Sequence, residues 1–222
     1  MTSRKRVAII GLGAGTHAKS VIDAIHSTQE FEPKALIDDD PDRADGDILG
    51  VPVIAEAEAL ARFRSEGIRH AFVGVGGTRD SALRERVFER LREAEFELPA
   101  IVHGKASVSP WARIGLGAQI LAGAVVNADA QIGDGVIVNT GAIVEHDCRI
   151  GVHAHIAPGA RLAGLVTVGS GAHVGIGAVV IEGISIGTGA LVAAGAVVVS
   201  DVEERVWVAG VPAREITRAG AS

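Results

Sequence analysis

Large aliphatic residues recur at every sixth position through the second half of the chain. The series contains sixteen residues without an insertion. Its members are Val108, Ile114, Ile120, Val126, Ile132, Val138, Val144, Ile150, Ile156, Leu162, Val168, Val174, Val180, Ile186, Val192 and Val198. A helix repeats its buried face every 3.6 residues and a two-faced strand every second residue, so neither explains a period of six. The pattern predicts a solenoid in which each hexad forms one side of a coil.

A smaller residue follows each large aliphatic residue by four positions. Between Ala112 and Ala196, this smaller residue is Ala in eleven of fifteen hexads. The exceptions are Val136, Cys148, Val166 and Ile184. A narrow interior with one branched and one small side chain per hexad leaves no room for rings. The composition agrees, because the whole chain holds only 5 Phe and 2 Trp, and no Tyr.

The first half of the chain alternates short apolar runs with amphipathic segments. Buried strands are expected over residues 6–11, 34–37 and 71–75. Helices are expected over residues 17–28, 56–66 and 80–96, where apolar residues follow helical spacing. This order predicts a small Rossmann-like α/β domain, with a parallel sheet covered by helices.

Charge and glycine content change near residue 103. Residues 1–103 hold 32 of the 48 charged residues, and residues 104–222 hold 20 of the 29 glycines. A shift of this kind marks a domain boundary. We therefore expect an α/β domain over residues 1–103 and a solenoid domain over residues 104–222. The tail from Asp201 is expected to cover the end of the solenoid, because solenoids need capped ends.

Net charge and cysteine content exclude several classes of protein. A formal charge of −6 argues against binding nucleic acid or an anionic membrane through bulk charge. Cys148 is the single cysteine, which excludes an internal disulfide and favours a cytoplasmic location. The basic N-terminus with its short apolar run is expected to start a buried strand rather than a signal peptide. Residues 162–181 are uncharged and long enough to cross a bilayer, but their glycines and six-residue period favour the solenoid.

Four short stretches of sequence indicate which family of solenoid proteins the chain resembles. They are Gly13-Ala-Gly-Thr-His-Ala-Lys19, Asp38-Asp39-Asp40, Glu145-His146-Asp147 and Gly210-Val-Pro-Ala-Arg214. Together with the hexads, they resemble the hexapeptide-repeat sugar acyltransferases of the sialic-acid O-acetyltransferase (NeuD) and UDP-aminosugar N-acetyltransferase (PglD) type, over nearly the whole chain. The resemblance implies that the solenoid is a left-handed parallel β-helix. It also implies a nucleotide sugar in the first domain, and acetyl-CoA along the solenoid between the subunits of a homotrimer.

The resemblance places the nucleotide sugar at a glycine-rich turn and an acidic cluster. Backbone N–H groups at a helix start form an anion site, and glycines permit close approach of a diphosphate. The residues expected there are Gly13, Gly15, Thr16, His17, Asp38, Asp39, Asp40 and Gly76. A bare tight turn and a solvated Asp-rich strand end are the alternative interpretations. Gly11 and Leu12 resemble an insertion in the family's shorter turn, and Thr16 stands where the family has Gly.

His146 is expected to be the catalytic base. Acyl transfer from a thioester to an amine or hydroxyl needs a base of near-neutral pKa. His146 occupies the third position of its hexad, away from the inward positions, so its imidazole is expected to be accessible. Asp147 matches the acidic residue that raises the basicity of this histidine in the family. The family more often has Glu there, so the shorter Asp147 is expected to hold the ring less well. An ordinary surface histidine beside a surface aspartate is the alternative.

The acetyl-CoA site is expected along the solenoid. The residues that the resemblance implies there are Asn139, His155, Gly175, Ile176 and Ala194. Asn139 is expected to orient the catalytic site, and His155 to meet the acetyl end. His155 and His173 are expected to stack one coil apart. Cys148 occupies an inward small position and is expected to be a core residue rather than a nucleophile.

The resemblance, together with these residues, implies an acetyl-CoA-dependent N-acetyltransferase of a UDP-linked amino sugar of the 4-amino-4,6-dideoxy type. The amine is expected to attack the thioester directly, without a metal or a covalent enzyme intermediate. O-acetylation of sialic acid, another sugar or an amino acid is an alternative within the enzyme class. A non-catalytic trimeric scaffold that binds nucleotide sugars is an alternative from another class. A zinc hydratase is a third, although the histidine intervals do not match the paired spacing that such solenoids use.

Overall fold

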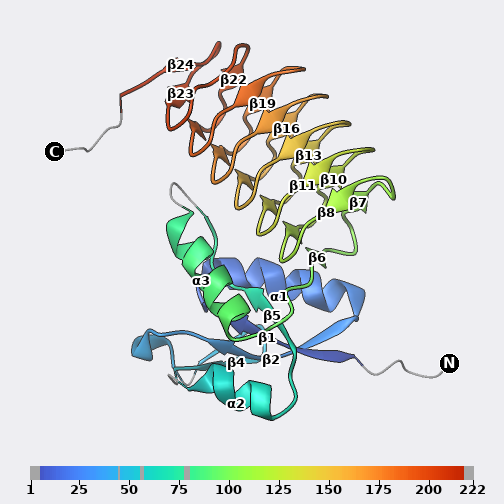
Figure 1. The fold of residues 1–222 in the computed structure, drawn as a ribbon, viewed down its shortest axis with the longest axis vertical. Coiled ribbons are helices and arrows are strands. Elements are labelled where there is room, and N and C mark those ends of the chain that lie inside the picture. Colours follow the sequence, from blue (N-terminus) through green and yellow to red (C-terminus); the bar gives the residue numbers. More distant parts are fainter. Residues whose placement is uncertain (1–5, 45, 56–57, 78–80, 218–222) are drawn as a thin grey trace. The chain divides into compact units, whose positions relative to one another are not determined.

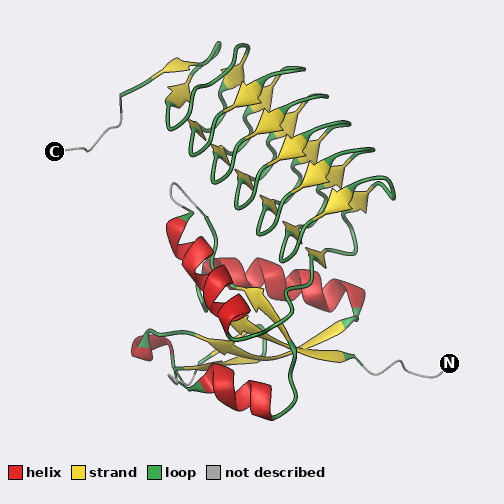
Figure 2. Cartoon of the chain, in the orientation of Figure 1, coloured by secondary structure: helices red, strands yellow, loops and turns green. Residues whose placement is uncertain are grey.

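The computed structural model describes residues 6–44, 46–55, 58–77 and 81–217. The chain divides into two compact units, which we treat separately. The first comprises the described residues of 6–77 and 82–104, and the second comprises Ser81 and the described residues from Lys105 onward. Figure 1 labels the elements of each unit, and Figure 2 shows that helices occur in the first unit and short strands dominate the second.

The first unit is an α/β domain built on a mostly parallel sheet. The strand order is β3-β4-β2-β1-β5. The strands are β1 (Val7–Leu12), β2 (Phe31–Ile37), β3 (Asp47–Ile48), β4 (Val51–Ile54) and β5 (His70–Val73), followed by β6 (Ile101–Val102). The helices are α1 (Thr16–Thr28), α2 (Ala59–Ser65), α3 (Ala82–Glu93) and the 3-10 turn η1 (Pro41–Arg43). Only β3 runs antiparallel to its neighbour in this sheet.

The expected strands and helices of this unit are present with shifted ends. The strand expected over 34–37 begins three residues earlier, at Phe31, and the strand expected over 71–75 is β5. The helix expected over 80–96 is observed as α3, and residue 80 lies outside the described residues. Residues 56 and 57 of the helix expected over 56–66 also lie outside the described residues. The short hairpin of β3 and β4 was not expected.

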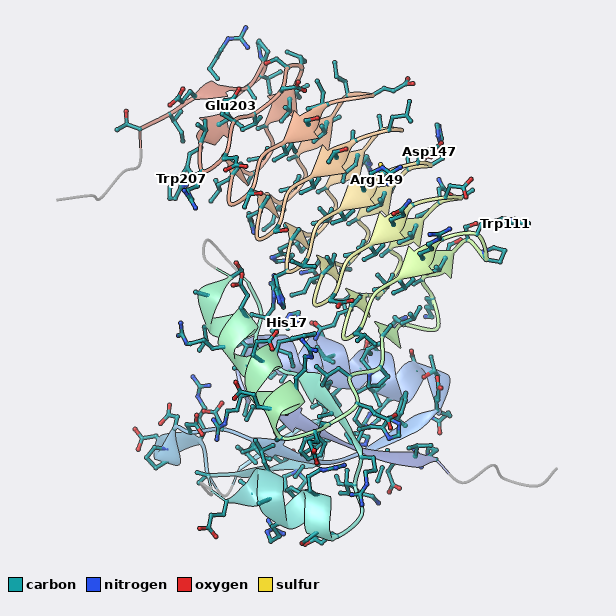
Figure 3. All side chains as sticks on the ribbon, in the orientation of Figure 1. His17, Trp111, Asp147, Arg149, Glu203 and Trp207 are labelled. Atoms are coloured by element: carbon teal, nitrogen blue, oxygen red, sulfur yellow. The ribbon has the colours of Figure 1, made fainter. Side chains whose placement is uncertain are left out.

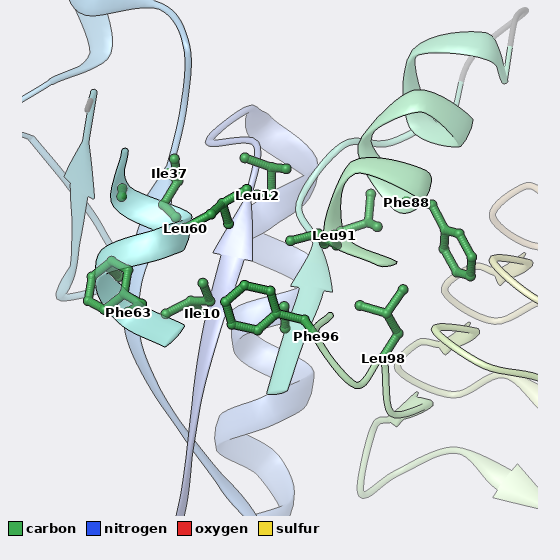
Figure 4. Packing of buried hydrophobic residues seen from close by; sticks show 13 residues of the cluster. Ile10, Leu12, Ile37, Leu60, Phe63, Phe88, Leu91, Phe96 and Leu98 are labelled. Atoms are coloured by element: carbon green, nitrogen blue, oxygen red, sulfur yellow. The ribbon is translucent and has the colours of Figure 1, made fainter. Parts of the chain in front are cut away.

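Aromatic side chains gather in the core of the first unit. Figure 4 shows Phe63 of α2, Phe88 of α3 and Phe96 among aliphatic residues from the strands. Leu91 is fully buried in the same cluster. All five Phe residues of the chain belong to this unit, so the solenoid core is left to aliphatic side chains.

The second unit is a three-sided parallel β-helix. Its strands are two or three residues long: β7 (Ser107–Val108), β8 (Arg113–Ile114), β9 (Gln119–Ile120), β10 (Val125–Val126), β11 (Gln131–Ile132), β12 (Ile137–Val138), β13 (Ile143–Val144), β14 (Arg149–Ile150), β15 (His155–Ile156), β16 (Arg161–Leu162), β17 (Thr167–Val168), β18 (His173–Val174), β19 (Val179–Val180), β20 (Ser185–Ile186), β21 (Leu191–Val192), β22 (Val197–Val198), β23 (Trp207–Ala209) and β24 (Arg214–Glu215). Every third strand stacks in register, so that Val126 pairs with Val144 and Val144 with Leu162. One coil therefore takes 18 residues, which is three hexads.

The hexad pattern accounts for the interior of the β-helix. Fourteen of the aliphatic hexad residues, from Ile120 to Val198, are at most 3% exposed. Val108 and Ile114 of the first coil are only half-buried. Gly151 shows why many hexads need glycine after the aliphatic residue, because a Cβ there would lie 2.6 Å from the amide nitrogen of Ser170 on the next coil.

The far end of the β-helix is closed by the tail. β23 adds to β21 in parallel, and β24 folds back against β23 in the antiparallel sense. Residues 162–181 form β16 to β19 of the coil rather than a membrane span. Among the described residues, no helix is long and apolar enough to cross a membrane.

Candidate active site

His146 and Asp147 sit at a corner of the β-helix, between β13 and β14. The corner stacks on its neighbours, because Asp147 N–H donates to the carbonyl of Ala128 at 3.1 Å and His146 accepts from Leu165 N–H at 3.0 Å. Asp147 has a φ of 60°, a left-handed conformation that aspartate tolerates better than most residues. It lies on the same edge of the β-helix as Trp111 (Figure 3). The corner turns the His146 side chain outward, and the side chain is 56% exposed, as expected.

The imidazole of His146 is oriented by Asp147. Nδ1 lies 2.9 Å from Asp147 Oδ2. A carboxylate only accepts hydrogen bonds, so Nδ1 carries the proton and Nε2 is the basic nitrogen. This hydrogen bond has a normal length, and the expectation that the shorter Asp147 holds the ring less well than Glu would stays a prediction.

Acidic neighbours make His146 more basic. The hydrogen bond to Asp147 raises the pKa of the imidazole above its ordinary value. The partial desolvation of the ring opposes this effect, while the negative charges of Glu145 and Glu182 add to it. The result is a stronger proton acceptor at the surface of the β-helix.

Glu145 is held by a residue that the sequence analysis did not single out. Asn127, one coil earlier, donates from Nδ2 to Glu145 Oε2 at 2.7 Å. The two residues are 18 positions apart, so the coil length is the signal that could have paired them.

Asn139 and His155 meet on the next face. Asn139 Nδ2 lies 3.0 Å from His155 Nε2, and His155 is buried. The stacking expected for His155 and His173 is confirmed, with ring centroids 4.9 Å apart and planes at 82°. Asn139 thus orients His155, whereas its expected role at the His146 corner stays a prediction.

The remaining residues expected at the acetyl-CoA site follow the repeat. A Cβ on Gly175 would lie 2.7 Å from the amide nitrogen of Ala194, so the coil spacing itself requires this glycine. Ile176 is 60% exposed, as are other large aliphatic side chains at the surface of this β-helix, such as Leu116 at 57% and Leu165 at 52%.

The glycine-rich turn lies between β1 and α1 in the first unit. Gly13 has a φ of +97° and donates its N–H to the carbonyl of Ile37 at 2.7 Å. Gly15 is the N-cap of α1 and provides no side-chain cap, and Thr16 is the first residue of that helix. His17, labelled in Figure 3, packs beside Gly76, where a Cβ would lie 3.0 Å from the His17 Cβ. The turn and Gly76 are therefore neighbours, as expected.

Asp38 fixes the glycine-rich turn. Its Oδ2 accepts from the N–H of Ala14 at 2.6 Å and from Arg43 Nη1 at 3.0 Å. Its Oδ1 accepts from Asp40 N–H at 3.0 Å. Burial alone would raise the pKa of Asp38, but these hydrogen bonds and the charge of Arg43 outweigh it and hold the pKa below its ordinary value.

The other two aspartates of the cluster are more open to solvent. Asp39 pairs with Arg90 Nη1 of α3 at 2.6 Å. Asp40 accepts from the N–H of Asp42 at 3.1 Å and caps η1. The sequence analysis did not single out Arg43, which pairs with Asp38, or Arg90, which pairs with Asp39. No sequence motif links either arginine to the aspartate that it contacts.

Cys148 is a core residue. It is fully buried, and its Sγ donates to the carbonyl of Ala163 at 3.2 Å. Burial raises the pKa of the thiol to about 11, which makes it a poor nucleophile. Across the described residues, no group of three or more His, Cys, Asp or Glu side chains is arranged to hold a metal ion.

Comparisons with known proteins agree with this architecture. Residues 6–91 match the family model of the PglD N-terminal domain. The structure of PerB from Caulobacter crescentus, in complex with CoA and GDP-perosamine, shares 41% identity with a TM-score of 0.88, covering 95% of this chain and 97% of PerB. The acetyltransferase domain of PglB from Neisseria gonorrhoeae, in complex with acetyl coenzyme A, shares 35% identity with a TM-score of 0.86, covering 96% and 100%. WeeI from Acinetobacter baumannii shares 26% identity with a TM-score of 0.81, covering 95% and 100%. No curated protein sequence matches the chain.

A Rossmann-like domain followed by a left-handed parallel β-helix defines a hexapeptide-repeat acyltransferase. The chain belongs to the family of sugar N-acetyltransferases that includes PerB and PglB. The fold class and the family expected from the sequence are both confirmed.

Proposed function

We propose that the chain transfers the acetyl group of acetyl-CoA to the amino group of a nucleotide-linked amino sugar. The observation that carries the proposal is an exposed imidazole held at Nδ1 by a carboxylate, in a chain 41% identical to an enzyme bound to CoA and GDP-perosamine. The imidazole is the base such a transfer requires, and the relative supplies the class of acceptor.

In this mechanism, His146 Nε2 takes a proton from the amine as its nitrogen attacks the thioester carbonyl. The C–N bond forms, and the tetrahedral intermediate collapses with loss of the C–S bond. The proton on His146 then passes to the departing CoA thiolate, so atoms and charge balance. Asp147 keeps the proton on Nδ1 and stabilises the imidazolium that forms between the two steps.

The first unit is the site we propose for the nucleotide diphosphate. The glycine-rich turn presents Gly13 and Gly15 at the start of α1, where backbone N–H groups favour an anion. Thr16, His17 and Gly76 border the same turn. The base expected from the sequence is uracil, whereas PerB was found with a guanosine nucleotide, so both belong in the test.

The finer features of the assembly are proposals as well. A homotrimer with acetyl-CoA between neighbouring β-helices would use Asn139, His155, Gly175, Ile176 and Ala194. The exposed Ile176 supports this, because a partner or the coenzyme would cover it. The single, buried Cys148 supports a reducing compartment such as the cytoplasm.

The test is an acceptor panel analysed by mass spectrometry and NMR of the product. The panel holds GDP-perosamine, UDP- and dTDP-linked 4-amino-4,6-dideoxy sugars, their 4-hydroxy counterparts, and free sialic acid. We expect a new amide on one nucleotide-linked amino sugar. An ester on a hydroxyl acceptor, with every amino sugar left unchanged, would overturn the proposal.

A further inference from the structure

The guanidinium of Arg43 lies beside the glycine-rich turn of the first unit. Arg43 is the last residue of η1. Its Nη1 lies 3.0 Å from Asp38 Oδ2, and its Nε lies 3.4 Å from Asp40 Oδ2. Because two carboxylates contact two different nitrogens, the planar group is held in one orientation. The same oxygen of Asp38 accepts from Ala14 N–H at 2.6 Å, so Arg43 and the turn share one anchor.

Gly15 leaves open space next to this guanidinium. Its φ of −75° suits any residue, so the backbone conformation does not require glycine. Packing does not require it either. A Cβ on Gly74 would clash with the carbonyl oxygen of Gly13, whereas the contact that a Cβ on Gly15 would make with the described residues beyond its chain neighbours is with Arg43 Nη1, at 4.0 Å. The missing side chain therefore keeps free the space between the start of α1 and Arg43.

Arginines offset the negative charge of the acidic cluster near this space. Asp38 and Asp40 both pair with Arg43. Asp39 pairs with Arg90 of α3. Three uncompensated carboxylates beside the start of α1 would repel a phosphate, and these pairs reduce that repulsion. The Arg43 side chain is still 49% exposed, and a guanidinium carries more N–H donors than its two carboxylate contacts use.

We propose that Arg43 binds the diphosphate of the nucleotide sugar, and that it makes the first unit prefer a nucleoside diphosphate over a monophosphate. The inference rests on the proposed function, which puts the diphosphate at this turn. A phosphate oxygen at about 2.9 Å from Nη1 would lie in the space that a side chain on Gly15 would fill. The fork of a guanidinium matches two phosphate oxygens, and the backbone N–H groups at the start of α1 add a second set of donors.

The first test measures nucleotide binding by isothermal titration calorimetry with the intact chain. The probes are UDP, GDP and the monophosphates UMP and GMP. For the base that the wild type binds more tightly, Arg43→Gln is expected to raise the Kd of the diphosphate about tenfold and that of the monophosphate less than about threefold. Arg43→Lys is expected to lie between the wild type and Arg43→Gln, because it keeps the charge and loses the fork.

A matched control removes an arginine elsewhere in the same unit. Arg92 of α3 is 56% exposed and pairs with Glu89 at 3.5 Å, so Arg92→Gln makes the same change in charge outside the turn. This variant is expected to bind all four nucleotides as the wild type does.

A second variant fills the open space and leaves Arg43 in place. Gly15→Ala adds a methyl group that neither the backbone conformation nor the neighbouring atoms oppose, so the Tm is expected to stay the same. Its Kd for the diphosphate is expected to rise about tenfold, because the methyl group takes the place of a phosphate oxygen and its hydrogen bond to Arg43.

Each result bears on Arg43 or on the proposed function. If Arg43→Gln weakens the diphosphate and the monophosphate equally, Arg43 only supports the turn and the inference is wrong. Unchanged binding in Arg43→Gln or in Gly15→Ala also overturns it. A wild type that binds neither UDP nor GDP contradicts both the proposed nucleotide site and the role of Arg43. A wild type that binds one of them with the expected variant effects, but acetylates no amino sugar, contradicts the proposed function alone.

Discussion

At the scale of single residues, the site depends on where a β-helix corner turns its side chains. Asp147 reaches Nδ1 of His146 although the two residues are adjacent, because Asp147 adopts a left-handed backbone conformation. The pair therefore needs no support from a distant element. The same local turn exposes the ring while leaving Cys148, the next residue, inside the core.

Asp147→Asn should move the pH dependence of acetyl transfer. The imidazole works as a base only when it is neutral, so kcat/KM rises as pH passes its pKa. Since Asp147 raises that pKa, its neutral replacement lowers it and shifts the acid limb to lower pH. The plateau rate should fall too, because the ring loses its fixed tautomer. A pH–rate profile checks both, and an acid limb that stays in place would contradict the assignment.

Cys148→Ala should leave acetyl transfer intact. The thiol is buried and its pKa is raised, so it forms no acyl intermediate. The expected cost is about 1 kcal/mol of unfolding free energy from the small void. Thermal unfolding and kcat of the variant are the measurements. A loss of activity in a variant that remains folded would point to a covalent mechanism instead.

At the scale of elements, the β1–α1 turn of the first unit depends on Asp38. The carboxylate ties Ala14 and Arg43 together, so it acts on the shape of the turn. The sequence suggested that this aspartate contacts the nucleotide, and that contact stays a prediction. Both of its oxygens already accept hydrogen bonds from the protein.

Asp38→Ala should weaken the binding of UDP or GDP by about tenfold, since the turn loses a charge-assisted hydrogen bond that orders it. Glu66→Gln is the control, because Glu66 is an exposed carboxylate of the same unit that pairs with Arg62 of α2. Isothermal titration of each variant with both nucleotides measures the effect. Equal weakening by both substitutions would show that overall charge, rather than the shape of the turn, governs binding.

The elements differ in how well the sequence predicted them. The period of six located every solenoid strand from Val108 to Val198, because each side of the coil has a fixed length and a fixed inward residue. The hairpin of β3 and β4 was not predicted, since a two-residue strand and a four-residue strand around Gly50 leave no periodic signal. The observed ends of the helices differ from the predicted ends, because the spacing of apolar residues identifies the buried face of a helix but not its capping residues.

The site was predicted in part for the same reason. His146 and Asp147 form one motif, so their contact follows from adjacency. The contacts of Asn139 with His155 and of His146 with Gly164 join neighbouring coils. They require the coil length together with side-chain directions, which only coordinates provide. The pairing of Asp38 with Arg43 depends on how η1 folds back toward the turn.

At the scale of the whole molecule, the two units divide the proposed work. In the proposal, the first unit presents the anion-binding turn and the β-helix presents the base. The proposed acetyl-CoA site lies between β-helices, so we predict that the active form is a trimer with three times the 22.7 kDa mass of the chain. Analytical ultracentrifugation at assay concentration measures this mass. A fully active monomer would contradict a site shared between subunits.

The central claim is that His146 is the base for acetyl transfer to a nucleotide-linked amino sugar. The most direct test follows thiol release from acetyl-CoA with GDP-perosamine and UDP-linked 4-amino sugars, comparing the wild type with His146→Ala and with His26→Ala as the matched control. The account predicts thiol release that requires the amino sugar and falls at least about a hundredfold in His146→Ala alone. Release that is independent of the amino sugar, or unchanged in His146→Ala, would contradict it.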